Sequence, residues 1–135
     1  MVAYKIHSIG FKTKAAKWRL NMKIFVKPFH TEFEVKPTNK NMIKTYQMQL
    51  AIAKSQDLAV MDDVVEQLTL ATNMTTTVVN YLDNILSLNE KQRKAVDNWE
   101  LSQTVETANY IAMRLMGMSD KDIKLAQQKD EKVKK

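Results

Sequence analysis

The chain changes character at Pro37, its last proline, after which Gly117 is the only glycine. Proline and glycine are the residues that most often interrupt helices, so the chain from Thr38 onward carries almost no break signals. Two short segments before Pro37 have instead the residue types of strands. The sequence predicts an α+β fold that is mostly α, with an N-terminal β-hairpin followed by a bundle of about five short helices.

The expected hairpin joins residues 22–27 to residues 32–36. The first segment is rich in β-branched and aromatic side chains, and the second alternates polar with apolar residues at period 2. Pro28 lies in the connection, and Pro37 ends the second strand. Because two strands are marginally stable alone, the hairpin is expected to pack on the helices.

The helical part begins with two apolar stripes. Ile43, Tyr46, Leu50 and Ala53 recur at helical spacing, and Leu58, Met61, Val65 and Leu68 repeat the pattern. Residues 55–57 either separate two helices or lie within a longer one. Residues 75–77, all Thr, offer caps for the next helix, whose apolar face would be Val78, Leu82 and Ile85 with Tyr81 and Leu86 at its sides.

The later helices carry clearer end signals. Asn89 is a typical N-cap for a short charged helix that includes Val96 and Trp99, and Val105, Ala108, Ala112 and Leu115 form the stripe of the next one. Gly117 is placed to end that helix, and Ser119 is placed to cap the last. Apolar residues become rare after Ala126. We therefore expect a single domain over 22–126 and a charged, flexible tail over 127–135.

Residues 1–21 form a leader that differs from the rest of the chain in charge. The whole chain has 21 Lys and Arg against 15 Asp and Glu, but the leader holds five of the basic residues and no acidic one. Removing those five leaves 16 basic and 15 acidic residues, a net charge of +1. A high pI suggests binding to nucleic acids or membranes, but most of the excess positive charge behind that inference lies in the leader.

Three interpretations of the leader are open: a transit peptide, a basic segment lying on a membrane, and upstream non-coding sequence read in frame. Trp18 is encoded by TGG and Arg19 can be encoded by AGG, which together contain the bacterial ribosome-binding sequence GGAGG two codons before Met22. We expect that 1–21 is either disordered or the product of a mis-assigned start, with Met22 as the first residue.

The sequence has little that suggests catalysis or a cofactor. It has no Cys and two His, and its two glycines exclude a phosphate-binding glycine loop. Asp62 and Glu66, beside Asp63, share a helix face and are of a type that binds Mg²⁺, but a solvated helix face explains them better. We expect no enzyme activity, no cofactor and no metal site. No apolar run reaches the length of a membrane span.

A helix-turn-helix is a second alternative, at residues 116–123. Gly117 and Ser119 suit its turn, but a DNA-reading helix would have to follow, and mostly charged residues remain. An ordinary turn between two helices, with Gly117 ending one and Ser119 capping the next, explains these residues better. A small helical DNA-binding regulator stays open as an alternative function.

Methionine is unusually frequent, with nine in the chain. Met113, Met116 and Met118 lie close together near the final turn, and flexible thioethers suit surfaces that accommodate irregular helical partners. Core filling is the competing explanation for each single methionine. With Phe25 and Phe33 of the hairpin, whose edge can accept a further strand, these three are the candidate partner-binding residues.

The features that carry a family resemblance are the start MKIFV, the charged hairpin, the run of helices and the close ANYIAMRLMGMSDKDIK. In these features the chain resembles the tail assembly chaperones of long-tailed bacteriophages of Gram-positive bacteria. The likeness covers most of residues 22–124 and is strongest over 108–124. It is a likeness of pattern and length.

The resemblance implies a non-enzymatic protein that coats and solubilises the tape-measure protein, associates with itself along it, and is displaced by tail-tube subunits. It implies action in the cytoplasm of the infected bacterium, absence from the mature virion, and a longer form made by ribosomal frameshifting, for which the Lys134 and Lys135 codons could supply a slippery sequence. A structural phage tail subunit is the remaining alternative. The resemblance implies no nucleic acid or membrane partner.

Overall fold

The computed structural model describes residues 22–134, and the leader expected over 1–21 lies outside them. Its first element is the predicted hairpin. β1 (Met22–Val26) pairs antiparallel with β2 (Thr31–Val35), and Ile24 lies opposite Phe33. The connection is a short 3-10 turn, η1 (Lys27–Phe29), closed by His30 in the left-handed conformation with φ 50°. The prediction of a hairpin is confirmed.

Two long helices follow and fold back on each other. α3 (Asn39–Ser55) is capped by the Thr38 hydroxyl, which accepts from the Asn41 amide. A tip over residues 56–63, which contains η2 (Leu58–Val60), leads into α4 (Val64–Leu86). The helix expected to begin at 75–77 is therefore the second half of α4. The Thr75 hydroxyl donates to the Ala71 carbonyl at 2.9 Å, so it is satisfied inside the helix and does not act as a cap.

Three shorter helices complete the chain: α5 (Glu90–Asp97), α6 (Leu101–Leu115) and α7 (Asp120–Lys134). Asn89 caps α5 in a full capping box with Gln92. The Ser119 hydroxyl accepts from the Asp122 amide at the start of α7. These caps were predicted from the sequence and are confirmed, as is the fold class, although α4 with 23 residues is not short.

α7 is helical through Lys134 and so includes most of residues 127–135, for which the sequence predicts a charged, flexible tail. Gln, Lys and Glu are good helix formers even where no apolar face packs, and residues 120–134 contain neither glycine nor proline. Ile123 is buried and Ala126 is half-buried, whereas Gln127 and Gln128 are exposed, and the helix continues past them.

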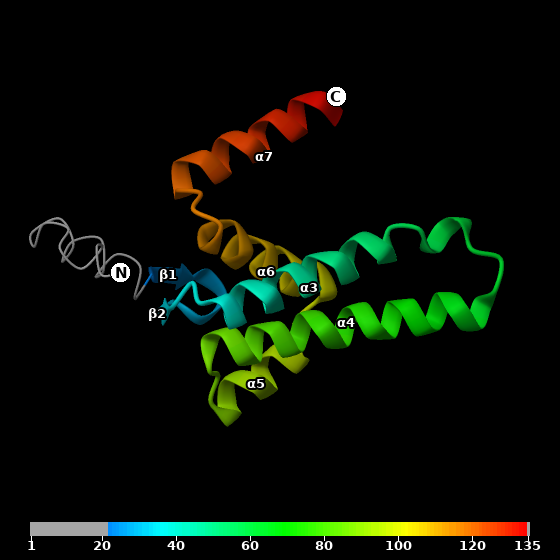
Figure 1. Ribbon diagram of the computed structural model, residues 1–135, viewed down its shortest axis with the longest axis horizontal. Helices are drawn as coiled ribbons and strands as arrows, with labels where there is room; N and C mark the ends of the chain where they lie inside the picture. Colours follow the sequence, from blue (N-terminus) through cyan, green and yellow to red (C-terminus); the bar gives the residue numbers. More distant parts are fainter. Residues whose placement is uncertain (1–21, 135) are drawn as a thin grey trace, which may run out of the picture.

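The core lies between the inner face of the hairpin and helices α3, α4 and α6. β1 contacts α6 and β2 contacts α4, while the alanines of α6 allow close approach. The fully buried side chains include Ile24, Val26, Val35, Met48, Val78, Leu82, Ala108, Ile111 and Ala112. Figure 1 shows the resulting shape: α3 and α4 extend side by side away from the hairpin, and α7 leads away from the body beyond α6.

Candidate functional site

Among the residues that the structure describes, the largest group of exposed apolar side chains lies on the arm. We define the arm as α3, the tip and the first turns of α4, residues 39–73 (Figure 1). Ile43, Tyr46 and Leu50 of α3 are 56%, 54% and 55% exposed. They are three of the four residues of the first stripe found in the sequence. An amphipathic stripe usually faces the core, but this one faces solvent.

The orientation of α3 explains why its stripe is uncovered. Thr45 and Met48 are fully buried, and the Thr45 hydroxyl lies 2.8 Å from the hydroxyl of Tyr81 on α4. Since successive residues turn by about 100°, Tyr46 and Leu50 lie on roughly the opposite side of α3 from Thr45 and Met48. α4 has therefore paired with the face of α3 that carries Thr45 and Met48.

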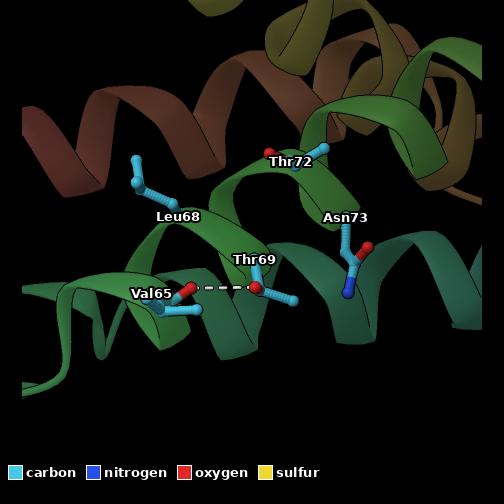
Figure 2. A pocket seen from close by; sticks show the side chains of 5 residues that line it. All are labelled: Val65, Leu68, Thr69, Thr72 and Asn73. Atoms are coloured by element: carbon cyan, nitrogen blue, oxygen red, sulfur yellow. Dashed lines mark hydrogen bonds between the residues drawn. The ribbon is translucent and has the colours of Figure 1, made fainter.

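A second exposed group lies on the tip and the start of α4. Its members, 63% to 79% exposed, are Val60, Val64, Val65 and Leu68. Figure 2 shows a shallow depression along this part of α4, lined by Val65, Leu68, Thr69, Thr72 and Asn73 of that single helix. By the same helical rotation, Val65 and Leu68 lie on the side of α4 away from Tyr81, and so away from α3.

Hydrogen bonds within the tip hold this second group in place. Asp63 caps α4, with its carboxylate accepting from the Val65 amide at 2.9 Å. The Gln67 side chain donates to the carbonyl groups of Leu58 and Met61 and so closes the tip onto α4. Asp63 lies beside Asp62 and Glu66, the two carboxylates that the sequence suggested as possible Mg²⁺ ligands, and it is engaged as a helix cap.

Charges are segregated along the arm. α3 carries three basic residues and no acidic one: Lys40, Lys44 and Lys54. Residues 56–68 carry four acidic residues and no basic one: Asp57, Asp62, Asp63 and Glu66. None of these seven side chains makes an ion pair with another described side chain. We call Ile43, Tyr46 and Leu50 with the three lysines the basic surface, and Val60, Val64, Val65 and Leu68 with the four acids the acidic surface.

The methionines chosen from the sequence have different surroundings. The Met118 amide donates to the Met113 carbonyl and the Gly117 amide to the Arg114 carbonyl, both at 3.0 Å, which is a Schellman motif. Met113 and Met118 occupy the two positions that commonly pack together in this motif, and both are half-buried. Met116, at 42% exposed, is the member of the trio that faces solvent.

The two phenylalanines chosen from the sequence lie on opposite faces of the hairpin. Phe25 is 45% exposed and pairs across the strands with Glu32. Phe33 is half-buried, and its ring lies 5.8 Å from that of Phe29, which in turn lies 5.1 Å from Trp99. Phe33 therefore belongs to an aromatic cluster that fastens the hairpin to the helices, while Phe25 remains accessible.

Arg114 connects the C-terminal end of α6 to both the hairpin and α7. Its Nη2 donates to the Lys23 carbonyl at 3.4 Å, and its Nη1 donates to the Asp120 carboxylate at 3.3 Å and to the Tyr110 hydroxyl at 3.2 Å. Burial, followed by the hydrogen bond to Asp120, raises the pKa of Tyr110. Met116 lies two residues after Arg114, and Phe25 lies two residues after Lys23. Because Arg114 donates a hydrogen bond to the Lys23 carbonyl, the structure brings Met116 and Phe25 to the same end of the molecule.

No group of three or more His, Asp or Glu side chains in the described part of the chain is arranged to hold a metal ion. Among the helices of residues 22–134, none combines the length and hydrophobicity needed to span a bilayer. What the arrangement offers is apolar and charged surface for binding other proteins. Sequence reasoning found the stripes of the arm but had no signal that they face outward.

Comparison with known proteins identifies the kind of chain that carries these surfaces. A family model described as phage tail assembly chaperone proteins (TAC) matches residues 22–132, which is most of the chain and all but the last two residues of the described part. No curated protein and no solved structure matches it. The chain therefore belongs to the family of phage tail assembly chaperones.

Proposed function

We propose that this tail assembly chaperone binds the tape-measure protein, keeps it soluble, and helps to recruit tail-tube subunits around it. As a member of its family the chain is a non-enzymatic chaperone that acts during phage tail assembly in the host cell. Binding of tail proteins follows from that membership, and the tape-measure protein and tube subunits are the partners we assign.

The observation that carries this proposal is the exposed apolar pair at one end of the body. Met116 extends from the last turn of α6 and Phe25 from the outer face of β1, and both are more than two-fifths exposed. Arg114 holds the two elements together through the Lys23 carbonyl. A thioether and an aromatic ring on a fixed support suit a helical partner whose side chains vary along its length.

The size of this pair also suits a chaperone that must leave. Two half-exposed side chains bury a small area, far below the roughly 1,600 Å² of a standard protein interface. Each contact is therefore weak, and many copies along one partner would give strong but reversible coverage through multivalency. Tube subunits that polymerise around the tape measure could then displace the copies one at a time.

The experiment is co-expression of the chaperone with fragments of the tape-measure protein of the same phage, with soluble yield as the readout. The double variant Phe25→Thr/Met116→Gln keeps strand and helix propensity while removing apolar surface. We expect it to lose at least half of the soluble fragment. Leu125→Gln is the matched control, since Leu125 is 51% exposed and belongs to α7 rather than to β1 or α6, and it should retain wild-type yield.

Two further readouts test the remaining parts of the proposal. We propose that the chain works in the cytoplasm of the infected bacterium and is absent from the mature virion, so mass spectrometry of purified particles should not detect it. Stoichiometric presence in particles would identify a structural tail subunit instead. A second, longer product of the same gene in infected cells would establish the proposed frameshifted form.

A further inference from the structure

We propose that the arm joins copies of this chain head to tail, with the basic surface of one copy packed against the acidic surface of the next. The proposal rests on the self-association expected of the chaperone and gives it an interface. It is independent of the tape-measure contact assigned to Met116 and Phe25.

Charge complementarity identifies a second copy as the occupant. The three lysines lie on the same helix as Ile43, Tyr46 and Leu50, and the four carboxylates lie in the same segment, residues 56–68, as the apolar group of the acidic surface. Within one chain these opposite charges make no ion pairs among the described side chains. The basic surface of one copy can therefore pack against the acidic surface of a neighbouring copy. That neighbour supplies both an apolar contact and the opposite charges, which the same chain does not supply.

The positions of the two surfaces determine the symmetry of the assembly. The basic surface faces away from α4, because Thr45 and Met48 occupy the side of α3 toward α4. Val65 and Leu68 of the acidic surface face away from α3, because Tyr81 occupies the side of α4 toward α3. Two different surfaces on opposite sides of one arm make a heterologous contact, which generates a ring or an open helical chain rather than a closed dimer.

The available area is enough for a specific but reversible contact. Each of the seven apolar side chains is only partly exposed and offers roughly 60 Å² of surface, by the proportion between buried area and burial free energy. With the flanking polar groups, one contact reaches about the 1,000 Å² at which specific interfaces begin. Such a contact forms at high local concentration and dissociates easily.

The test is a charge swap followed by mixing, with the full chain studied by sedimentation velocity over a range of concentrations. One variant carries Lys40→Glu, Lys44→Glu and Lys54→Glu, and the other carries Asp57→Lys, Asp62→Lys and Glu66→Lys, leaving the Asp63 cap intact. We expect wild type to associate with concentration, and each variant alone to remain monomeric. An equimolar mixture should associate again, because each altered surface then meets its complement.

Salt and an apolar substitution provide independent readouts. Wild-type association should weaken at least tenfold between 0.05 and 0.5 M salt, since screening shortens the reach of the charges to a few ångströms. Leu50→Gln should abolish association, while Leu101→Gln, which removes a side chain 47% exposed on α6 outside the arm, should not. Circular dichroism confirms that each variant remains folded.

Several outcomes would overturn the inference. They are a wild-type chain that stays monomeric at 0.5 mM, charge variants that associate alone as well as wild type does, and a mixture that fails to recover association. If the arm variants lose tape-measure solubilisation while self-association is unchanged, the occupant of the arm is the tape-measure protein. In that case the head-to-tail contact is wrong while the proposed chaperone function stands.

Discussion

The hydroxyl groups of Thr45 and Tyr81 lie 2.8 Å apart in the core and join α3 to α4 across 36 residues of sequence. Thr45 also donates to the Asn41 carbonyl at 2.8 Å, and a threonine hydroxyl has a single proton. Tyr81 is therefore the donor and Thr45 the acceptor. This bond fixes which face of α3 is turned inward, and so which face is left to bind partners.

The direction of the bond predicts unequal costs for removing its two ends. Tyr81→Phe leaves Thr45 with its bond to Asn41 and should lower the free energy of unfolding by about 1 kcal/mol. Thr45→Val keeps the shape but leaves the buried Tyr81 hydroxyl without a partner, which should cost about 1–3 kcal/mol. In the double variant the loss should be smaller than the sum. Urea unfolding measures all three, and equal single costs that add would contradict the assignment.

High pH should destabilise the protein through Tyr81. Burial raises the pKa of Tyr81 to about 12, against the ordinary value of 10 that applies in the unfolded chain. Its contribution is fully present below pH 10 and is lost as pH rises toward 12, because the unfolded chain ionises first. The loss should be about 1 kcal/mol at pH 11 and up to about 3 kcal/mol above pH 12.

Tyr81→Phe provides the comparison for this pH effect. Other groups titrate equally in both proteins, so the difference in unfolding free energy between wild type and Tyr81→Phe isolates Tyr81. That difference should shrink and then reverse between pH 9 and pH 12 in urea titrations. A constant difference over this range would show that Tyr81 ionises in the folded protein as it does in water.

Gly117 should resist substitution for purely conformational reasons. Its φ is +98°, and a Cβ placed on it would meet no atom within 4 Å. Gly117→Ala should therefore lower the free energy of unfolding by about 1–2 kcal/mol through backbone strain alone, with no steric clash. Thermal unfolding provides the measurement. An alanine variant as stable as wild type would mean that the Schellman turn between α6 and α7 is not formed in solution.

The capping box of α5 should contribute measurably to stability. Asn89 accepts from the Gln92 amide at 2.8 Å, and the Gln92 side chain accepts from the Asn89 amide at 3.0 Å. Asn89→Ala should lower the free energy of unfolding by about 1 kcal/mol, because α5 carries the buried Val96 into the core. Asn80→Ala, an exposed change inside α4, is the control and should have an effect within about 0.5 kcal/mol. Denaturant titration distinguishes the two.

Local chemistry in the sequence predicted much of the fold. The hairpin, the Asn89 and Ser119 caps and the Gly117 turn each depend on residues within a few positions of one another, and each is confirmed. The supposed caps at 75–77 failed because a threonine hydroxyl can also be satisfied inside a helix.

The candidate surfaces were less predictable than the elements that carry them. Residue type and closeness in sequence grouped Met113, Met116 and Met118, yet two of them stand at the paired positions of a helix end. Membership of the hairpin grouped Phe25 with Phe33, although strand pairing puts them on opposite faces. Whether such a side chain is accessible depends on backbone geometry that residue counts do not contain.

By itself the sequence determined where the chain is extended or helical, where the arm's charges are basic or acidic, and that Ile43, Tyr46 and Leu50 share one helix face. Only the tertiary structure decided that this face is exposed and that Thr45 is buried in its place. The physical reason is that periodicity defines the faces of a helix, while burial depends on which face a distant element covers. Here the buried pair of Thr45 and Tyr81 joins α4 to the other side of α3.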